Sequence, residues 1–251
     1  MAASGATIDD AELGRFAAQA DAWWDPAGSL RMLHRLNPVR LGFIRSRLVR
    51  HFHRDPSQLR PFVGLGLIDI GCGGGLVAEP MARLGFSVTG VDAEPEAIAT
   101  ARAHADAAGV DIDYRVAEVE SMAAAGLRFD AVLALEVIEH VADRDAFLEA
   151  FARLLAPGGA AVIATLNRTA RSFALAIVGA EYLLGWLPRG THDWRKFVRP
   201  SELILGLRRN HLRATEITGV GYDPIRGEWA LSSRLDVNYL VVAERAGAAR
   251  R

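Results

Sequence analysis

The sequence has 251 residues, 51% hydrophobic and 24% charged, a composition typical of a folded soluble domain and not of a disordered chain. Its formal net charge of −1 provides no general attraction for nucleic acid, so we expect no nucleic-acid partner. The single cysteine, Cys72, excludes an intrachain disulfide and a zinc site built from thiolates. The first residues lack the basic and apolar regions of a secretory signal, and we expect a cytoplasmic protein.

Along the chain, an N-terminal helical cap is expected over residues 1–60. It contains two segments with helical apolar spacing, Asp9–Trp24 and Pro38–His53, and Pro38 suits a first helical turn. A domain over residues 61–245 follows, with an insertion at 167–200, and residues 246–251 are expected to form a disordered tail.

Strand and helix patterns alternate through the main domain. The expected strands are Leu65–Gly71, Phe86–Val91, Ile112–Val116, Ala131–Leu135, Ala160–Leu166, Ala214–Val220 and Val237–Ala243. The expected helices are Leu76–Leu84, Glu94–Ala108, Asp143–Leu155 and Pro200–Arg209. Such alternation predicts an α/β fold with a seven-stranded, mostly parallel sheet and helices on both faces. Only a loop separates the last two strands, which favours one antiparallel strand.

The most informative motif is the run Leu67–Gly75, in which a buried strand delivers Asp69 into a turn made almost entirely of glycine. Glycine lets backbone adopt positive φ or approach a ligand closely. A carboxylate at this strand end repels a pyrophosphate but suits a cationic ligand. Asp92 closes the next strand, where a carboxylate can accept hydrogen bonds from a ribose diol. The pattern therefore predicts a site for S-adenosylmethionine, a nucleoside with a positively charged amino-acid tail.

Each residue of this donor site has an expected role. Gly71 and Gly73 let the methionine part lie against the turn, while Asp69 organises the turn or faces the ammonium group. Asp92 accepts hydrogen bonds from the ribose hydroxyls. Leu135, at the tip of the fourth strand, packs beside the donor.

Glu136, Glu139 and His140 follow the fourth strand at the spacing that places three side chains on one face of a helical turn. Two carboxylates and an imidazole suit Mg, Mn or Zn, and such a metal would lower the pKa of a bound phenol. A structural or acid–base role without metal is the alternative, in which His140 is the candidate general base.

The insertion contains an apolar stretch, Ser172–Leu187, which predicts either a core helix or a helix lying on a membrane surface. Basic residues at 168, 171, 189, 195 and 196 flank it and favour an anionic membrane surface contacting residues 168–196. His192 and Asp193 fit a solvated loop or an approach to the substrate from a lid.

The glycine turn, Phe129-Asp130-Ala131-Val132 and Leu155-Ala156-Pro157-Gly158-Gly159 together resemble the class I S-adenosylmethionine-dependent methyltransferases. A closer resemblance, to the UbiG-type O-methyltransferases of ubiquinone biosynthesis, covers nearly the whole chain. It is carried by Leu36-Asn37-Pro38-Val39-Arg40-Leu41, Asp69–Gly75, Thr165-Leu166-Asn167-Arg168, Val178-Gly179-Ala180-Glu181-Tyr182, Gly190-Thr191-His192-Asp193 and Asp236-Val237-Asn238-Tyr239.

This resemblance implies methylation of phenolic or catecholic hydroxyls of polyprenylated ubiquinone precursors, at both O-methylation steps. It further implies that Arg40 contacts the methyl donor, with Gly71, Asp92 and Leu135 at the family's other donor positions. Methionine is common in the family where Leu135 stands. A metal at Glu136, Glu139 and His140 matches the Glu-x-x-Glu-His of eukaryotic relatives.

The polyprenylated substrate also implies peripheral association with the inner membrane surface and a place in a quinone-biosynthesis complex. Two alternatives remain open from the sequence. One is a methyltransferase acting on another small molecule. The other is a non-catalytic donor-binding subunit of a quinone-synthesis complex.

Overall fold

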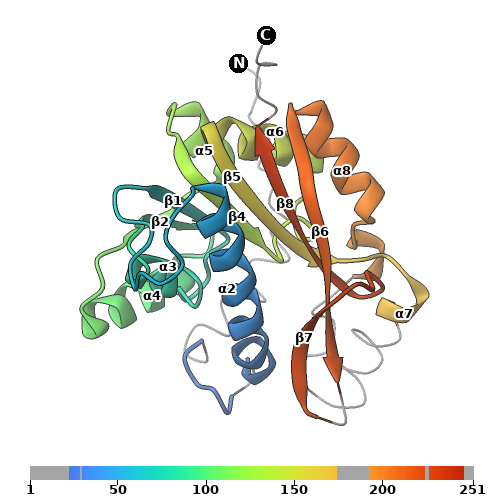
Figure 1. Cartoon of the computed structure of the whole chain (residues 1–251), viewed down its shortest axis with the longest axis horizontal. Helices are drawn as coiled ribbons and strands as arrows, with labels where there is room; N and C mark the ends of the chain where they lie inside the picture. Colours follow the sequence, from blue (N-terminus) through green and yellow to red (C-terminus); the bar gives the residue numbers. More distant parts are fainter. Residues whose placement is uncertain (1–22, 29, 174–192, 224–225, 246–251) are drawn as a thin grey trace.

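The computed structural model describes residues 23–28, 30–173, 193–223 and 226–245. Within these ranges eight strands form one sheet in the order β3-β2-β1-β4-β5-β8-β6-β7 (Figure 1). The strands are β1 (Gly66–Ile70), β2 (Ser87–Asp92), β3 (Asp113–Val116), β4 (Phe129–Leu135), β5 (Leu155–Leu166), β6 (Leu212–Asp223), β7 (Glu228–Ser232) and β8 (Asn238–Arg245). The helices are α2 (Arg31–His51), α3 (Ala78–Arg83), α4 (Pro95–Ala108), α5 (Val119–Ala124), α6 (Arg144–Leu154), α7 (Ala170–Ser172), the 3-10 helix η3 (Trp194–Lys196) and α8 (Pro200–Arg209).

The sheet confirms the predicted α/β class. Within the described residues it has eight strands, whereas seven were predicted. Strands β1 to β5 pair in parallel, and β8 pairs antiparallel with both β5 and β6. The additional strand is β7, which pairs antiparallel with β6 at the edge of the sheet. Its sequence, Glu-Trp-Ala-Leu-Ser, is short and mostly exposed, so it lacks the buried apolar run that marked the other strands.

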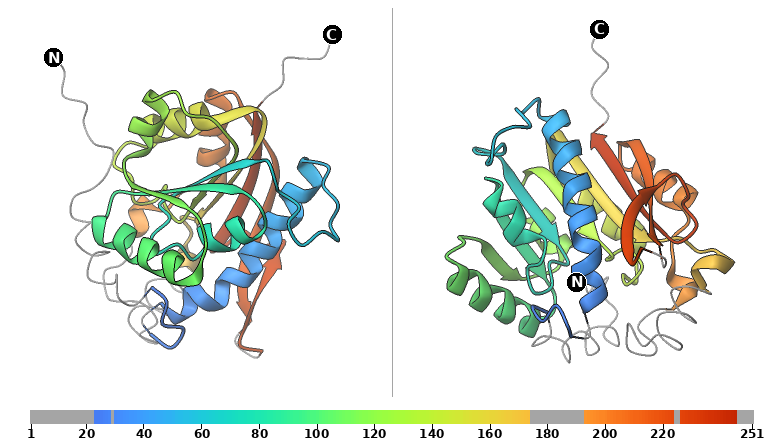
Figure 2. Two further views of the ribbon diagram at one scale, coloured as in Figure 1. Left: turned by 90° about the vertical axis from the view of Figure 1, so that its left-hand side faces the viewer. Right: turned by 60° about the horizontal axis from the view of Figure 1, so that its bottom comes forward.

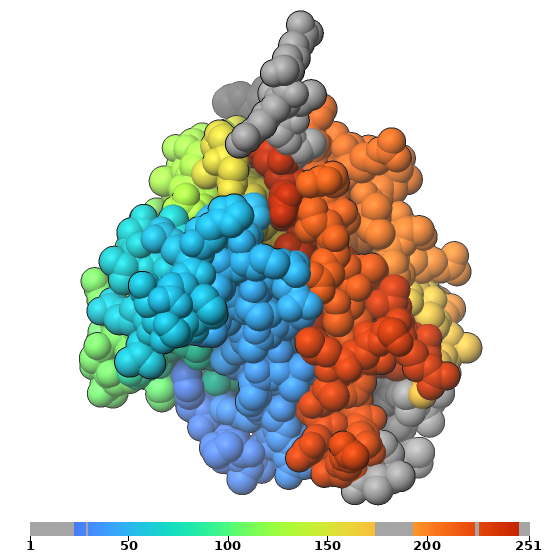
Figure 3. Space-filling view, in the orientation of Figure 1, coloured from blue at the N-terminus to red at the C-terminus, as the bar shows by residue number. Residues whose placement is uncertain are grey.

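Side chains that alternate along each strand divide the core into two layers. Leu67 of β1 packs with α2, α3 and α4 on one face, whereas its neighbour Ile68 packs with α5, α6 and α8 on the other. Helices therefore cover both faces, as predicted. In Figure 2, α2 crosses the first face, and in the space-filling view of Figure 3 it lies beside β6 and β7.

Helix α2 begins at Arg31, seven residues before the predicted start, and Pro38 lies inside it. Reading Pro38 as a first-turn residue was therefore wrong. The apolar face of this helix, with Phe43 and Ile44 almost fully buried, outweighs the backbone hydrogen bond that proline removes. Most of the predicted Asp9–Trp24 helix and the 246–251 tail lie outside the described residues. Helix α5 was not predicted.

Candidate functional site

The glycine turn follows β1 and is held by the tip of β2. The backbone N–H groups of Gly71 and Cys72 donate to the carbonyl of Val91 at 2.8 and 3.1 Å. Gly71 has a φ of +68°, and a Cβ built on it would lie 2.4 Å from Val137 Cγ2. A side chain is therefore excluded here by both conformation and space. The turn brings backbone to the carboxyl ends of the parallel strands, the edge at which α/β folds bind ligands.

Asp92 ties this turn to the end of β2. Its Oδ2 accepts a hydrogen bond from the Gly73 N–H at 2.9 Å, and its Oδ1 accepts one from the Glu94 N–H at 3.0 Å. Burial raises the pKa of Asp92, and these backbone donors oppose the rise. Gly73 and Asp92, which the sequence predicted as separate donor-site residues, therefore lie together. Each carboxylate oxygen retains lone pairs for further donors.

Asp69 lies beneath the turn and is 2% exposed. The backbone N–H of Ala78, at the start of α3, donates to this carboxyl, while its Oδ2 is buried without a partner. Burial and the nearby Asp92 carboxylate raise the pKa of Asp69 to about 7. A cation placed beside this carboxyl would stabilise its charged form and lower its pKa.

Arg40 reaches the same edge of the sheet from α2. Its guanidinium, 3% exposed, forms an ion pair with Glu136, the residue that follows β4. Burial lowers the pKa of Arg40 to about 10, and the Glu139 carboxylate opposes this shift. Because that pKa is still far above neutral, the guanidinium is a permanent cation at the strand tips.

The segment after β4 does not form the helical turn that the metal prediction assumed. Glu136 has a left-handed φ of +55°, and its N–H donates to the carbonyl of Ala164 at 2.9 Å. Residues 138–140 form a hydrogen-bonded turn. Leu135, partly buried at the tip of β4, packs against the core layer that contains α2.

Glu139 is 1% exposed and accepts a hydrogen bond from Thr165 Oγ1 at 2.7 Å. Its other oxygen is buried without a hydrogen-bond partner. Glu136 faces Arg40, as described above. Across the described part of the chain, no group of three His, Cys, Asp or Glu side chains is placed to hold a metal ion. The residues as arranged do not fit a metal, and the metal role of Glu136, Glu139 and His140 stays a prediction.

Sequence reasoning missed Trp23 and Trp24, which precede α2. The Trp23 ring lies against Gly73 and Gly74, and the Trp24 indole N–H donates to the Gly74 carbonyl at 2.8 Å. The available signal was a pair of adjacent tryptophans before an Asp-Pro turn.

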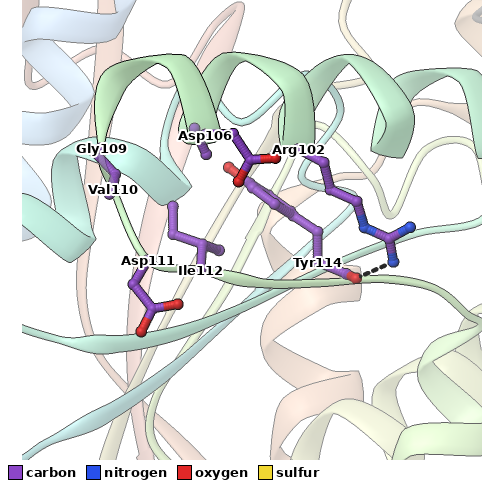
Figure 4. A pocket seen from close by; sticks show the side chains of 8 residues that line it. Arg102, Asp106, Gly109, Val110, Asp111, Ile112 and Tyr114 are labelled. Atoms are coloured by element: carbon purple, nitrogen blue, oxygen red, sulfur yellow. Dashed lines mark hydrogen bonds between the residues drawn. The ribbon is translucent and has the colours of Figure 1, made fainter.

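A separate shallow pocket of about 310 Å³ lies between the end of α4 and the start of β3 (Figure 4). It is lined by Arg102, Ala105, Asp106, Gly109, Val110, Asp111, Ile112 and Tyr114. None of the predicted site residues is among them. Tyr114, which lines this pocket, also reaches the glycine turn, since a Cβ built on Gly75 would lie 2.3 Å from its hydroxyl oxygen.

Only the two ends of the predicted insertion are described, residues 167–173 and 193–200. Phe173 is 46% exposed and contacts Trp194 edge-on, with ring centroids 6.2 Å apart. Most of the Ser172–Leu187 stretch, together with His192, lies outside the described residues. Among the described helices, none has the length and apolar content needed to cross a bilayer.

Comparison with known proteins shows which family this chain resembles. Residues 68–163 match the methyltransferase domain family. The chain is 54% identical over 242 residues to the ubiquinone biosynthesis O-methyltransferase of Methylobacterium nodulans, covering 96% of this chain and 97% of the relative. It is 53% identical over 241 residues to the protein of the same name from Azorhizobium caulinodans, covering 96% and 95%.

Among solved structures, the chain is similar to magnesium protoporphyrin IX methyltransferase from Synechocystis with bound SAH. The TM-score is 0.61 at 19% identity, covering 86% of this chain and 85% of that one. At this identity the likeness shows the fold alone, and it is the fold that the glycine turn and the parallel strands predicted.

Proposed function

Because this chain belongs to the ubiquinone biosynthesis O-methyltransferases, we propose that it transfers the methyl group of S-adenosylmethionine to a phenolic hydroxyl of a polyprenylated ubiquinone precursor. The observation that carries the proposal is identity above 50% over nearly the full length of both chains. The glycine turn and its two carboxylates supply the matching site.

We assign donor binding to the residues gathered at the strand tips. Gly71 and Gly73 admit the methionine part, and the Arg40 guanidinium pairs with the donor carboxylate. Asp92 accepts hydrogen bonds from the ribose hydroxyls, and the buried Asp69 carboxylate favours the cationic end of the donor. Leu135, which packs beside Arg40's helix at the end of β4, forms an apolar wall of the same site.

S-adenosylmethionine supplies a methyl carbon made electrophilic by its bond to a positive sulfur. The phenolic oxygen forms a bond to this carbon while the carbon–sulfur bond breaks, and its electron pair stays on sulfur. We assign the proton released by the phenol to His140, because imidazole is the side chain that most often serves as a general base. We assign no step to a metal; Glu136 pairs with Arg40, and one oxygen of Glu139 accepts a hydrogen bond from Thr165. Alignment of oxygen, carbon and sulfur is the protein's main contribution.

We further propose that one site serves both O-methylation steps and that residues 168–196 contact an anionic membrane surface. The exposed Phe173 and the basic residues 168, 171, 195 and 196 of the same segment support a surface that meets lipid headgroups. Arg168 and Arg171 also pair with Glu202 and Asp236, so lipid headgroups would compete with these carboxylates. Replacing Leu183, Leu184 and Trp186 by glutamine should reduce sedimentation with anionic vesicles. The same sedimentation for the variant and the parent protein would reject the membrane contact.

Methyl transfer is tested with purified protein, methyl-labelled donor and reduced polyprenyl catechol and phenol analogues. We expect labelled methyl on the phenolic oxygen of both acceptors. Label on carbon, or unlabelled acceptors together with turnover of another small molecule, would overturn the acceptor assignment. Donor binding without any turnover would favour a non-catalytic subunit.

A further inference from the structure

The segment before α2 places an aromatic side chain directly on the glycine turn. A Cβ built on Gly73 would lie 2.3 Å from Trp23 Cη2, and one built on Gly74 would lie 2.4 Å from Trp23 Cγ. The indole therefore lies lengthwise along both glycines, and their missing side chains make room for it. Gly73 is also the residue whose N–H binds Asp92, so the ring covers the turn where the two strand tips meet.

Three contacts from different elements fix this segment. The Trp23 carbonyl is 2.8 Å from His34 Nε2 of α2. The Trp24 indole N–H donates to the Gly74 carbonyl, and the Trp24 ring stacks on His104 of α4 with centroids 3.5 Å apart. His104 Nδ1 in turn lies 2.6 Å from the buried Glu79 of α3. Trp24 is thus an anchor, which holds its neighbour Trp23 in place over the turn.

Trp23 itself keeps an unused polar atom. Its Nε1 is buried and has no hydrogen-bond partner in the structure. An indole N–H can only donate, and buried donors in folded proteins are nearly always paired. The atom belongs to a ring that lies on the surface assigned above to the methyl donor, which carries carboxylate and hydroxyl oxygens. The face of an indole also attracts cations.

We propose that Trp23 is a donor-binding residue, whose ring borders bound S-adenosylmethionine beside the glycine turn and whose Nε1–H donates to one of its oxygens. This inference rests on the proposed function, because it requires the donor to occupy the glycine turn. It adds to the site a residue from outside the sheet and its crossover helices. It also gives the segment before α2 a part in holding the donor.

The test compares Trp23→Phe and Trp23→Ala with the parent protein by calorimetric titration with S-adenosylhomocysteine. Phenylalanine keeps an aromatic ring and removes the N–H, so we expect affinity to fall about fivefold, the usual effect of one lost hydrogen bond. Alanine removes the ring as well, and the expected loss is at least about tenfold. In turnover assays the KM for the donor should rise, while the KM for the acceptor stays within about twofold.

Trp229→Phe is the matched control. Its Nε1 is likewise buried without a partner, but Trp229 lies on β7, separated from β1 by four strands of the sheet. We expect this variant to bind S-adenosylhomocysteine as the parent does. Melting temperatures of all variants would show whether any loss reflects unfolding, and Trp23→Phe keeps the test valid if Trp23→Ala fails to fold.

The outcomes separate this inference from the function on which it rests. A parent protein that does not bind S-adenosylhomocysteine would overturn the proposed function. If the parent binds and Trp23→Phe binds equally well, the Trp23 inference is wrong while the function stands. Tighter binding by either Trp23 variant would also overturn it, because the indole would then occupy the space of the donor.

Discussion

The buried guanidinium of Arg40 forms an ion pair with the partly exposed Glu136, which joins α2 to the tip of β4. The two residues are 96 positions apart in sequence, and the pair places a permanent cation beside the glycine turn. If the donor carboxylate binds this guanidinium, it must share it with Glu136 or displace it. The ion pair therefore links donor binding to the position of α2.

Arg40→Gln tests this link. The variant keeps a side chain of similar length but loses the charge and the guanidinium fork, so affinity for S-adenosylhomocysteine should fall about 10- to 100-fold. Titration calorimetry measures the loss, and Arg35→Gln, at an exposed position of the same helix, is the control. Equal affinity of Arg40→Gln and the parent would reject the assigned role.

Asp92→Ala should weaken binding of S-adenosylhomocysteine by about 10-fold or more, because buried ribose hydroxyls lose their acceptor. The change also removes the acceptor of Gly73 N–H, so affinity alone does not isolate the ribose contact. A 2′-deoxy analogue does so. It should bind the parent less tightly than the complete ligand does, whereas Asp92→Ala should bind both ligands equally. If Asp92→Ala still bound the complete ligand more tightly than the 2′-deoxy analogue, the ribose hydroxyl would contact another residue.

Asp69 should make stability fall as pH rises. Burial and Asp92 raise the pKa of this carboxyl from 3.8 to about 7 in the folded protein. Between about pH 4 and 7 the folded state therefore binds more protons than the unfolded state, and the free energy of unfolding decreases with increasing pH. Asp69→Asn keeps an acceptor for the Ala78 N–H but does not titrate. Urea unfolding across this range should show a flatter pH dependence for the variant. Parallel curves for both proteins would contradict the assigned titration.

The positive φ of Gly71 predicts opposite effects of one substitution at two glycines. Gly71→Ala forces a side chain into a left-handed conformation and against Val137, so the free energy of unfolding should fall by about 2–4 kcal/mol. Gly42 lies in α2 with nothing within 4 Å of an added Cβ, so Gly42→Ala should raise the free energy of unfolding by about 0.5–1 kcal/mol. Denaturant unfolding measures both. A Gly71→Ala variant as stable as the parent would contradict the described turn.

The assignment of His140 predicts that His140→Gln lowers kcat by about 10²- to 10⁴-fold with little change in donor affinity. Activity of the parent should survive a strong chelator. Activity that is lost on chelation and restored by Mg, Mn or Zn would contradict the metal-free step. Loss of that metal stimulation in Glu136→Ala with Glu139→Ala would then favour the metal role predicted from the sequence.

The sequence was sufficient to predict the parallel half of the sheet and the place of the glycine turn, because buried strands and glycine-rich turns are local signals. It was insufficient for β7, whose pairing with β6 depends on tertiary contacts along an exposed edge. The spacing of Glu136, Glu139 and His140 suggested a helical face, but the backbone after β4 takes a left-handed step at Glu136 instead. Trp23 was missed because its contact with Gly73 spans 50 residues and carries no periodicity.

We propose that the glycine turn, Asp92 and Arg40 together form one site for S-adenosylmethionine. A crystal structure of the protein with S-adenosylhomocysteine tests it most directly. The ligand is expected against Gly71 and Gly73, with its ribose on Asp92 and its carboxylate on Arg40. A ligand bound elsewhere, or this crevice filled by the protein's own side chains at saturating ligand, would contradict it.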